Sequence, residues 1–323
     1  MTTLVLAAAF LLSALANGLM ARGLGWLPHD RPNERSLHAR AVPRSGGVGI
    51  ALGVGVAAWL ASGFGLAALL ALVLALALVS LVDDARGLPV APRLGAQLLA
   101  ALAFLWLYAP PAWGVSAWLL ALPLLIWMTN LYNFMDGSDG LAGGMALFGF
   151  GAYGLAAWVA GDAQLALAAF ALAAAAMGFL LFNFHPARIF MGDVGSIPLG
   201  FLAAALGLLG LWRGLWPWAF PVLVFSPFIV DASVTLARRL LRGERVWQAH
   251  REHYYQRLIR SGTGHRATAW WSYGLMAVCA AAALYLRHRP ESVPPMLLAF
   301  GMCYGLLMVW LDRRWNIHES NQS

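Results

Sequence analysis

The chain of 323 residues is 61% hydrophobic and only 11% charged, which excludes a soluble globular protein with a hydrated surface. Its formal net charge is +7, and all 21 of its lysine-plus-arginine residues are arginines. Membrane orientation and anionic ligands or lipids account for this charge, so we expect no nucleic-acid partner.

Apolar runs, each long enough to cross a hydrocarbon core about 30 Å thick, recur along the chain. They predict an all-α fold, a polytopic integral membrane helical bundle of about eleven transmembrane helices forming a single domain, 1–323. Ala, Leu and Gly dominate these runs, and small residues favour close helix packing. The predicted spans are 3–20, 46–62, 64–82, 94–110, 114–133, 141–160, 164–182, 196–212, 217–240, 269–287 and 295–311.

The distribution of arginines predicts the orientation of these spans. No positive charge precedes the first apolar run and arginines follow it, so we expect a retained membrane helix rather than a cleaved signal peptide. Because basic residues stay cytoplasmic, the N-terminus is expected outside and the C-terminus, after an odd number of spans, in the cytoplasm. Only Arg213, Arg287 and Arg289 would then lie outside.

Four polar patches lie between spans, all on the predicted cytoplasmic side. An acidic side chain at the bilayer centre costs about 2.5 to 3.5 kcal/mol, so charged residues often just mark helix ends. Here, however, carboxylates stand beside Asn, Gly, His and Arg, the residue types that a phosphate and metal site uses. The first patch is Asp83-Asp84 at the end of the third span. One or two such carboxylates, together with substrate phosphates, complete a Mg²⁺ site.

The second and third patches combine polar side chains with glycines. Asn133 ends the fifth span, and Asp136 and Asp139 follow it among glycines that let the backbone turn toward a ligand. The third patch, residues 183–196, leads into the eighth span, whose N-terminal N–H groups can bind phosphate. Phe190 within it fits a membrane-interface anchor as well as an aromatic ring that stacks on a ligand.

The fourth patch is the basic loop 238–266, centred on His250-Arg251-Glu252-His253. It lacks the Cys ligands and the H-E-x-x-H order of common zinc sites, so phosphate contacts or proton transfer fit it better than zinc. A solvated basic loop is the alternative. Asp231, inside the ninth span, is expected to brace a helix that reaches toward this patch.

Taken in order, the patches resemble the polyprenyl-phosphate N-acetylhexosamine-1-phosphate transferases over almost the whole chain. This family includes phospho-N-acetylmuramoyl-pentapeptide transferases and UDP-GlcNAc:undecaprenyl-phosphate transferases. The resemblance is carried by Pro43-Arg-Ser-Gly-Gly47, Asp83-Asp84, Asn133-x-x-Asp136-Gly-x-Asp139-Gly140, Phe190-Met-Gly-Asp193-x-Gly-Ser196 and the histidine loop.

The resemblance implies a reaction in which a lipid phosphate attacks the sugar-linked phosphorus of a UDP-sugar and releases UMP. It implies undecaprenyl phosphate and a UDP-N-acetylhexosamine as substrates, Mg²⁺ as the cofactor with Mn²⁺ as an alternative, and a location among lipids of the bacterial inner membrane. It leaves a homodimer open. A divalent ion and arginines would offset the repulsion between the two anionic substrates.

The resemblance also assigns roles to single residues. Asp193 would bind the metal, and Asp83 and Asp84 would be catalytic. A phosphate monoester has a second pKa of about 6, so it is already mostly ionised at neutral pH. We therefore expect Asp83 to position the lipid phosphate and balance charge rather than to abstract a proton. The roles of general base and metal ligand stay open for Asp83. The residues implied to bind substrate are Arg44, Asn133, Asp136, Asp139, Asn183, Phe190, His250, Arg251 and His253.

The chain departs from the muramoyl-pentapeptide branch because it has no lysine and its histidines are not consecutive. The stretches Asn33-Glu-Arg-Ser-Leu-His38-x-Arg40 and Ala249-His-Arg-Glu-His-Tyr-Tyr-Gln-Arg-Leu258 look most like those of the O-antigen and cell-envelope initiators, which use GlcNAc, QuiNAc or FucNAc. The muramoyl-pentapeptide transferases are therefore the alternative within the family. A lipid-linked sugar transporter or flippase is the alternative from another class, and it is disfavoured because the acids crowd one interface rather than the membrane midplane.

Overall fold

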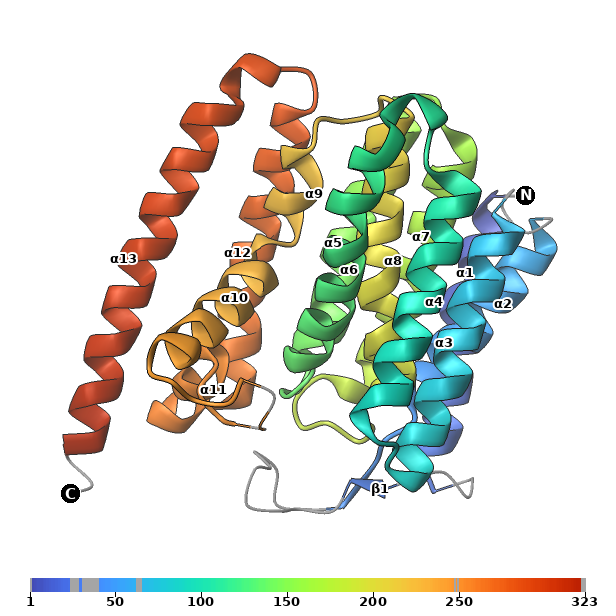
Figure 1. The fold of residues 1–323 in the computed structure, drawn as a ribbon. Helices are drawn as coiled ribbons and strands as arrows, with labels where there is room; N and C mark the ends of the chain where they lie inside the picture. Colours follow the sequence, from blue (N-terminus) through green and yellow to red (C-terminus); the bar gives the residue numbers. More distant parts are fainter. Residues whose placement is uncertain are drawn as a thin grey trace.

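The computed structural model describes residues 2–23, 29–30, 41–61, 66–246, 248 and 250–320, and these form a bundle of helices (Figure 1). Within this part of the chain the strands are two-residue segments, β1 (His29–Asp30) and β2 (Val42–Pro43), which pair antiparallel. The helices are α1 (Thr2–Ala21), α2 (Gly46–Leu60), α3 (Ala67–Arg86), α4 (Val90–Tyr108), α5 (Gly114–Phe134), α6 (Leu141–Val159), α7 (Ala163–Asn183), α8 (Asp193–Trp212), α9 (Ala219–Val224), α10 (Ser226–Leu241), α11 (Tyr254–Leu258), α12 (Gly264–Leu286) and α13 (Val293–Ser320). Short 3₁₀ or π turns lie at Pro111–Trp113, Ile259–Thr263 and Pro290–Ser292.

Eight helical segments of the described residues are long and apolar enough to cross a membrane. They comprise α1, α3, α4, α6, α7, α8 and the two C-terminal segments that contain α12 and α13, while α2 and the apolar part of α5 are shorter. The predicted all-α polytopic bundle is therefore confirmed, and the chain is a multi-pass membrane protein.

The ninth predicted span is divided into two helices, α9 and α10, at Phe225. Pro227 lies in the first turn of α10, where its missing N–H removes no helical hydrogen bond. The Ser226 hydroxyl donates to the Leu223 carbonyl at 2.7 Å across the junction. The chain changes direction here, and α10 then leads into the predicted histidine loop (Figure 1).

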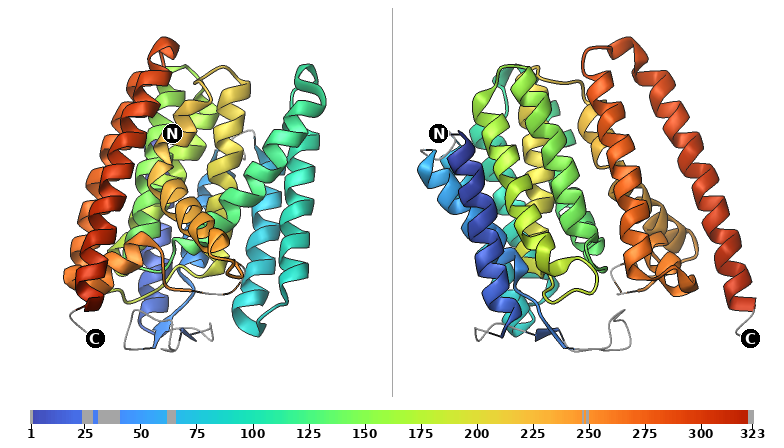
Figure 2. Two further views of the ribbon diagram at one scale, coloured as in Figure 1. Left: turned by 60° about the vertical axis from the view of Figure 1, so that its left-hand side comes forward. Right: turned by 180° about the vertical axis from the view of Figure 1, so that it is seen from behind.

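The polar loops gather at one end of the bundle, which we call the lower end. It holds β1, the C-terminal ends of α3, α5 and α7, and the N-terminal end of α8 (Figures 1 and 2). The C-terminus lies at this end and the N-terminus toward the other (Figure 1). This is the alternation that the sequence predicts, while the end that faces the cytoplasm stays a prediction.

Helix α8 is the centre of the packing, because every residue from Asp193 to Gly210 is buried. Close packing against α5 depends on Gly200, where an added Cβ would lie only 2.6 Å from the Met128 carbonyl oxygen. Small residues at such contacts let transmembrane backbones approach each other. The lower end of α8 carries Asp193, so this packing fixes the carboxylate in the protein.

Candidate active site

Arg44 joins two of the predicted patches at the lower end. Its Nη2 lies 2.6 Å from Asp193 Oδ1 and its Nε lies 3.4 Å from Asp84 Oδ1. The Arg44 side chain is 39% exposed, whereas those of Asp84 and Asp193 are 2% and 10% exposed. One partly exposed guanidinium thus pairs with two buried carboxylates from different helices.

The backbone around Arg44 is held against the loop that precedes α8. Phe190 N–H donates to the Pro43 carbonyl at 2.8 Å, and Gly46 N–H donates back to the Phe190 carbonyl at 2.8 Å. Gly47 packs directly on Gly195, where an added Cβ would lie 2.3 Å from backbone atoms. The Pro43–Gly47 stretch and the Phe190–Ser196 stretch therefore form one unit.

The Asp84 carboxylate contacts the N-terminus of α8. Its Oδ2 accepts a hydrogen bond from Val194 N–H at 3.1 Å, and a carboxylate is favourable at the positive end of a helix dipole. With Arg44 beside its other oxygen, Asp84 has protein partners on both sides. This geometry suits a residue that holds α3 to α8 beside Asp193.

Asp83 faces a different partner, Arg93, which the sequence did not single out. Arg93 Nη1 lies 2.9 Å from Asp83 Oδ2 and 3.9 Å from Asp193 Oδ2. The second Asp83 oxygen accepts Leu88 N–H at 2.7 Å. The sequence does not predict Arg93 as a site residue, because the predicted fourth span begins just after it. An arginine so close to an apolar run is the signal that would indicate a paired, functional charge.

A small polar cavity of about 100 Å³ lies among these groups. Asp83, Arg93, Asn133 and Asp193 line it, and Asn133 also accepts the Ser196 hydroxyl hydrogen bond at 2.8 Å. Within the described residues, no three His, Cys, Asp or Glu side chains converge as a complete metal site. A cation here would therefore use one or two carboxylates and complete its shell with substrate oxygens or water, as Mg²⁺ commonly does.

Asp139 and Asn183 belong to a second cluster that holds loops together. Asp139 Oδ2 lies 2.6 Å from His185 Nδ1 and accepts Ala187 N–H at 3.1 Å. Asn183 accepts Gly140 N–H at 3.0 Å and donates to the Ile189 carbonyl at 2.9 Å. Both side chains are engaged by the protein and buried, so the geometry gives them a bracing role; their contact with substrate stays a prediction.

Asp136 and Phe190 are both half-buried near these clusters. Asp136 N–H donates to the Asn133 carbonyl at 3.1 Å in the turn after α5. Phe190 forms a parallel bridge with Arg44 through its backbone. The structure thus brings both residues to the lower end, while their predicted contact with the donor stays a prediction.

The histidine loop is anchored by Asp231 on α10. Asp231 Oδ1 lies 3.2 Å from His253 Nδ1 and accepts Tyr254 N–H at 3.0 Å, while Oδ2 accepts Tyr255 N–H at 3.0 Å. Asp231 is only 7% exposed. A buried carboxylate at the first N–H groups of α11 stabilises the helix start and orients His253. Asp231 therefore has a structural role, but it holds the start of α11 and His253 rather than bracing its own helix as the sequence predicts.

His253 is itself buried, stacks on the Phe134 ring and lies beside the tilted ring of His250. Its ring centroid lies 6.3 Å from that of Phe134 on α5 and 4.8 Å from that of His250. The loop therefore packs beside the end of α5, which carries Asn133 one position earlier. This contact brings the fourth predicted patch to the second.

His250 and Arg251 differ in their electrostatic setting. Burial, followed by the nearby His253 and Arg239, lowers the pKa of His250 from its ordinary 6.5 to about 4. His250 is therefore neutral at pH 7. The Arg251 side chain has no ion-pair partner among the described residues, so its charge is available to an anionic ligand.

Comparisons with known proteins show which family the chain resembles. The sequence profile described as glycosyl transferase family 4 matches residues 66–211. The chain is 29% identical to a probable undecaprenyl-phosphate N-acetylglucosaminyl 1-phosphate transferase of Bacillus subtilis (strain 168), covering 80% of this chain and 77% of that protein. It is 31% identical to a decaprenyl-phosphate N-acetylglucosaminephosphotransferase of Mycobacterium tuberculosis (strain ATCC 25618 / H37Rv), covering 92% and 85%. It is also 35% identical to a phospho-N-acetylmuramoyl-pentapeptide-transferase of Moorella thermoacetica, covering 65% and 72%.

Proposed function

Because this chain belongs to glycosyl transferase family 4, the polyprenyl-phosphate N-acetylhexosamine-1-phosphate transferases, we propose that it transfers an N-acetylhexosamine 1-phosphate from a UDP-sugar to undecaprenyl phosphate. An oxygen of the lipid phosphate forms a new bond to the sugar-linked phosphorus, and the bond from that phosphorus to the UMP oxygen breaks. The products are UMP and a lipid-linked sugar diphosphate.

The observation that carries the proposal is the cluster of Asp83, Asp84, Asp193, Arg44 and Arg93 at one end of an apolar bundle. Both substrates are anionic at their reacting ends, and the acceptor is anchored in lipid. Arginines at a membrane-proximal cavity bind and orient such phosphates. A transporter would be expected to have its binding site near the midplane of the membrane, whereas this reaction needs no site there.

Asp193 and Asp83 fit a divalent cation because both line the polar cavity with oxygen ligands. We assign Asp193 as the protein ligand of Mg²⁺, with Mn²⁺ as an alternative that uses the same oxygen donors. When bound, the ion supplies charge neutralisation for the transferring phosphoryl group and the departing UMP. Asp83 then positions the acceptor phosphate through Arg93, and Asp84 keeps the N-terminus of α8 in place.

We assign the donor to the side of the cavity formed by the end of α5 and the histidine loop. Asn133 reaches the cavity, and Arg251 offers a charge to the diphosphate. Neutral His250 is suited to hydrogen bonds with the sugar rather than to an ion pair, and His253, which Asp231 orients, lies beside it. The donors that we propose are UDP-GlcNAc, UDP-QuiNAc or UDP-FucNAc, in a pathway that initiates O-antigen or another cell-envelope glycan.

We propose that the lower end faces the cytoplasm of a bacterium and that the chain is a single transferase domain of the inner membrane. Arg22, Arg86, Arg93 and the arginines after α10 belong to loops or helix ends at the lower end, whereas Arg213, Arg287 and Arg289 follow helices that end at the other. Basic residues stay on the cytoplasmic side, which supports this orientation.

The test is to incubate the purified protein with undecaprenyl phosphate, Mg²⁺ and single UDP-sugars, and to measure UMP and the lipid product. We expect turnover with at least one of UDP-GlcNAc, UDP-QuiNAc and UDP-FucNAc. Turnover with UDP-MurNAc-pentapeptide alone would move the chain to that branch of the family. UMP release from no donor would overturn the proposed reaction.

A further inference from the structure

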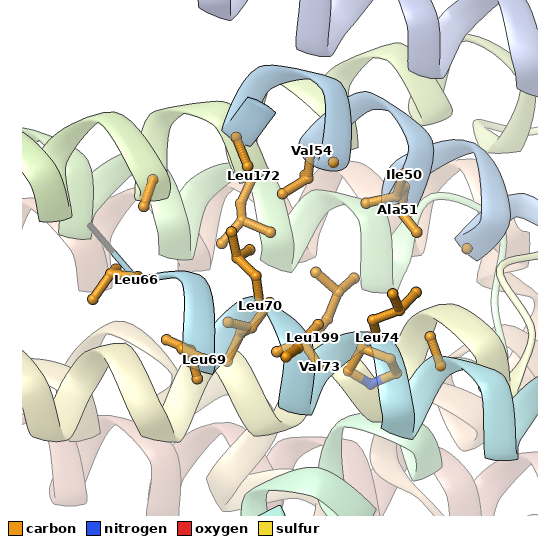
Figure 3. A pocket seen from close by; sticks show the side chains of 18 of the residues that line it. Ile50, Ala51, Val54, Leu66, Leu69, Leu70, Val73, Leu74, Leu172 and Leu199 are labelled. Atoms are coloured by element: carbon orange, nitrogen blue, oxygen red, sulfur yellow. The ribbon is translucent and has the colours of Figure 1, made fainter. Parts of the chain in front are cut away.

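Helix α13 lies at the edge of the bundle, and an apolar cavity of about 940 Å³ lies between it and helices α10 and α12 (Figure 1). The lining of this cavity includes Asp231 and Arg314. By contrast, the groove of about 540 Å³ between α2 and α3, where Ile50 and Val54 face Leu74, is lined by apolar residues and glycines in the described part of the chain (Figure 3). The cavity beside α13 therefore has charged groups on its wall, and one of them, Asp231, anchors the histidine loop.

Asp312 of α13 binds arginines of two neighbouring helices. Its Oδ2 lies 2.8 Å from Arg238 Nη1 on α10, and its Oδ1 lies 3.2 Å from Arg257 Nη1 on α11. Arg257 Nη2 in turn lies 3.7 Å from Glu252 Oε2 in the histidine loop. The Arg257 side chain is only 15% exposed, so water and salt screen its ion pairs less than they screen pairs at the surface. Asp312, Arg257 and Glu252 thus form an ionic path from α13 to the residue next to Arg251.

Trp315 of α13 reaches the same loop by a different route. It comes three positions after Asp312, so both side chains lie on one face of the helix, and it is buried. The Arg260 guanidinium lies over the Trp315 ring, 4.7 Å from its centroid, in a cation–π contact. Arg260 Nη1 also donates to the Arg251 main-chain carbonyl at 3.3 Å. Trp315 and Arg260 thus form a stacked path from α13 to the main chain of Arg251.

We propose that α13 positions Arg251 for the diphosphate of the donor through the ionic path and the stacked path, and this inference rests on the proposed function. Asp312 and Trp315 act through other residues rather than on the donor, so they are positioning residues. Binding a diphosphate orders both the side chain and the main chain of Arg251. A main chain that is already held in place therefore lowers the entropy cost of binding the donor.

Arg238 provides a matched control for Arg257. Both guanidinium groups bind the Asp312 carboxylate, and they lie 5.4 and 5.6 Å from the centroid of the same ring, that of Tyr254. They differ in one respect, because Arg257 also pairs with Glu252. Arg238→Gln therefore weakens the attachment of α13 to α10 and leaves the ionic path intact, whereas Arg257→Gln breaks the path.

We expect Arg257→Gln and Asp312→Asn to raise the KM for the UDP-sugar by about threefold to thirtyfold, a range typical of coupling within one salt-bridge network. Trp315→Leu should cause the same selective rise. The kcat and the KM for undecaprenyl phosphate should stay within about twofold of wild type, because the loop positions the donor alone. Arg238→Gln should match wild type, and Asp312→Glu, which keeps the charge, should restore most of the donor affinity.

Two kinetic results would overturn the proposal. One is an equal rise in the KM for the UDP-sugar in Arg238→Gln and Arg257→Gln, since Asp312 would then serve only to attach α13. The other is a wild-type KM for the UDP-sugar in Arg257→Gln or in Trp315→Leu, with the variant eluting as folded protein in size-exclusion chromatography.

Hydrogen exchange separates the positioning of Arg251 from the reaction. In Arg257→Gln and Trp315→Leu, residues 250–258 should exchange faster than in wild type or Arg238→Gln, while residues 264–286 of α12 keep their exchange rates. This readout needs no substrate, so faster exchange without UMP release from any donor would keep the hold of α13 on the loop and reject the reaction. Unchanged exchange at residues 250–258 in both variants would reject the positioning role.

Discussion

Arg44 Nη2 donates to Asp193 Oδ1 at 2.6 Å across 149 positions of sequence. The same side chain reaches Asp84, so the loop before α2 is tied through one residue to the ends of α3 and α8. Lysine would carry the same charge but lacks the planar group that contacts two carboxylates at once.

We therefore expect Arg44→Lys and Arg44→Ala to lower kcat/KM by about 10-fold to 150-fold, the range that corresponds to losing one charged hydrogen bond. The loss should appear with every donor sugar, because the contact lies in the cluster rather than at the sugar. Arg245→Ala is the control, since this exposed side chain has no ion pair within the described residues. Steady-state UMP release measures the effect, and wild-type rates in Arg44→Ala would contradict the assignment.

Asp193→Asn should abolish measurable turnover or lower kcat by more than about a hundredfold, because even the outer-shell partners of a metal ligand contribute about 10-fold to 100-fold. Removing the metal with EDTA should stop the wild-type reaction, and Mg²⁺ should restore it. In Asp193→Asn the Mg²⁺ concentration for half-maximal activity should rise.

Asp84→Asn is the matched comparison for that variant. The amide oxygen can still accept the Val194 N–H, while the ion pair with Arg44 is lost. Activity should fall less than in Asp193→Asn, and the Mg²⁺ requirement should stay unchanged. A shifted Mg²⁺ requirement in Asp84→Asn alone would show that the metal ligand is Asp84 rather than Asp193.

Asp231→Ala should loosen the histidine loop while the membrane helices remain folded. We expect faster hydrogen exchange at residues 250–258 and a KM for the UDP-sugar raised about tenfold, because the buried partners of a lost carboxylate are left unpaired. The KM for undecaprenyl phosphate should not change. Thr235→Val, which removes only the 3.3 Å contact from the Thr235 hydroxyl to Asp231, should behave like wild type.

His250 should make stability depend on pH in the acidic range. Its pKa is lowered from 6.5 to about 4 in the folded protein, so the unfolded chain binds a proton there between pH 6.5 and 4 and the folded chain does not. Stability should therefore fall as the pH decreases from 6.5 to 4. His250→Gln should reduce the drop in Tm over that window, whereas His288→Gln at the opposite end of the bundle should not. An unchanged pH slope in His250→Gln would contradict this origin.

The sequence predicted the helices well, because an apolar run that crosses lipid has few structures other than a helix in which its backbone hydrogen bonds are satisfied. It misplaced boundaries where charged residues belong to helices. The fourth span was predicted to begin at 94, yet α4 begins at Val90 and includes Arg93, whose charge is paired with Asp83. The eighth was predicted to begin at 196, yet α8 begins at Asp193, whose charge is paired with Arg44.

The sequence predicts which residues belong to the site, but it does not predict which of them contact one another. Local spacing gives no signal that Asp231 binds the backbone of Tyr254 and Tyr255, 23 and 24 positions away. The same holds for the pairing of Asp139 with His185, which joins loops at the ends of α5 and α7. Such contacts depend on how the helices pack, and only the folded bundle determines that.

The contacts that Asp231 makes with Tyr254 and Tyr255 are to main-chain N–H groups, which every residue except proline possesses. These main-chain contacts therefore do not depend on the identity of the side chain at residue 251, whereas the Glu252 carboxylate also holds the loop through Arg239, Arg242 and Arg257. Exchanging the residues around Arg251 between relatives, with Glu252 and Asp231 kept, should therefore change sugar preference while the helices that carry the loop stay the same.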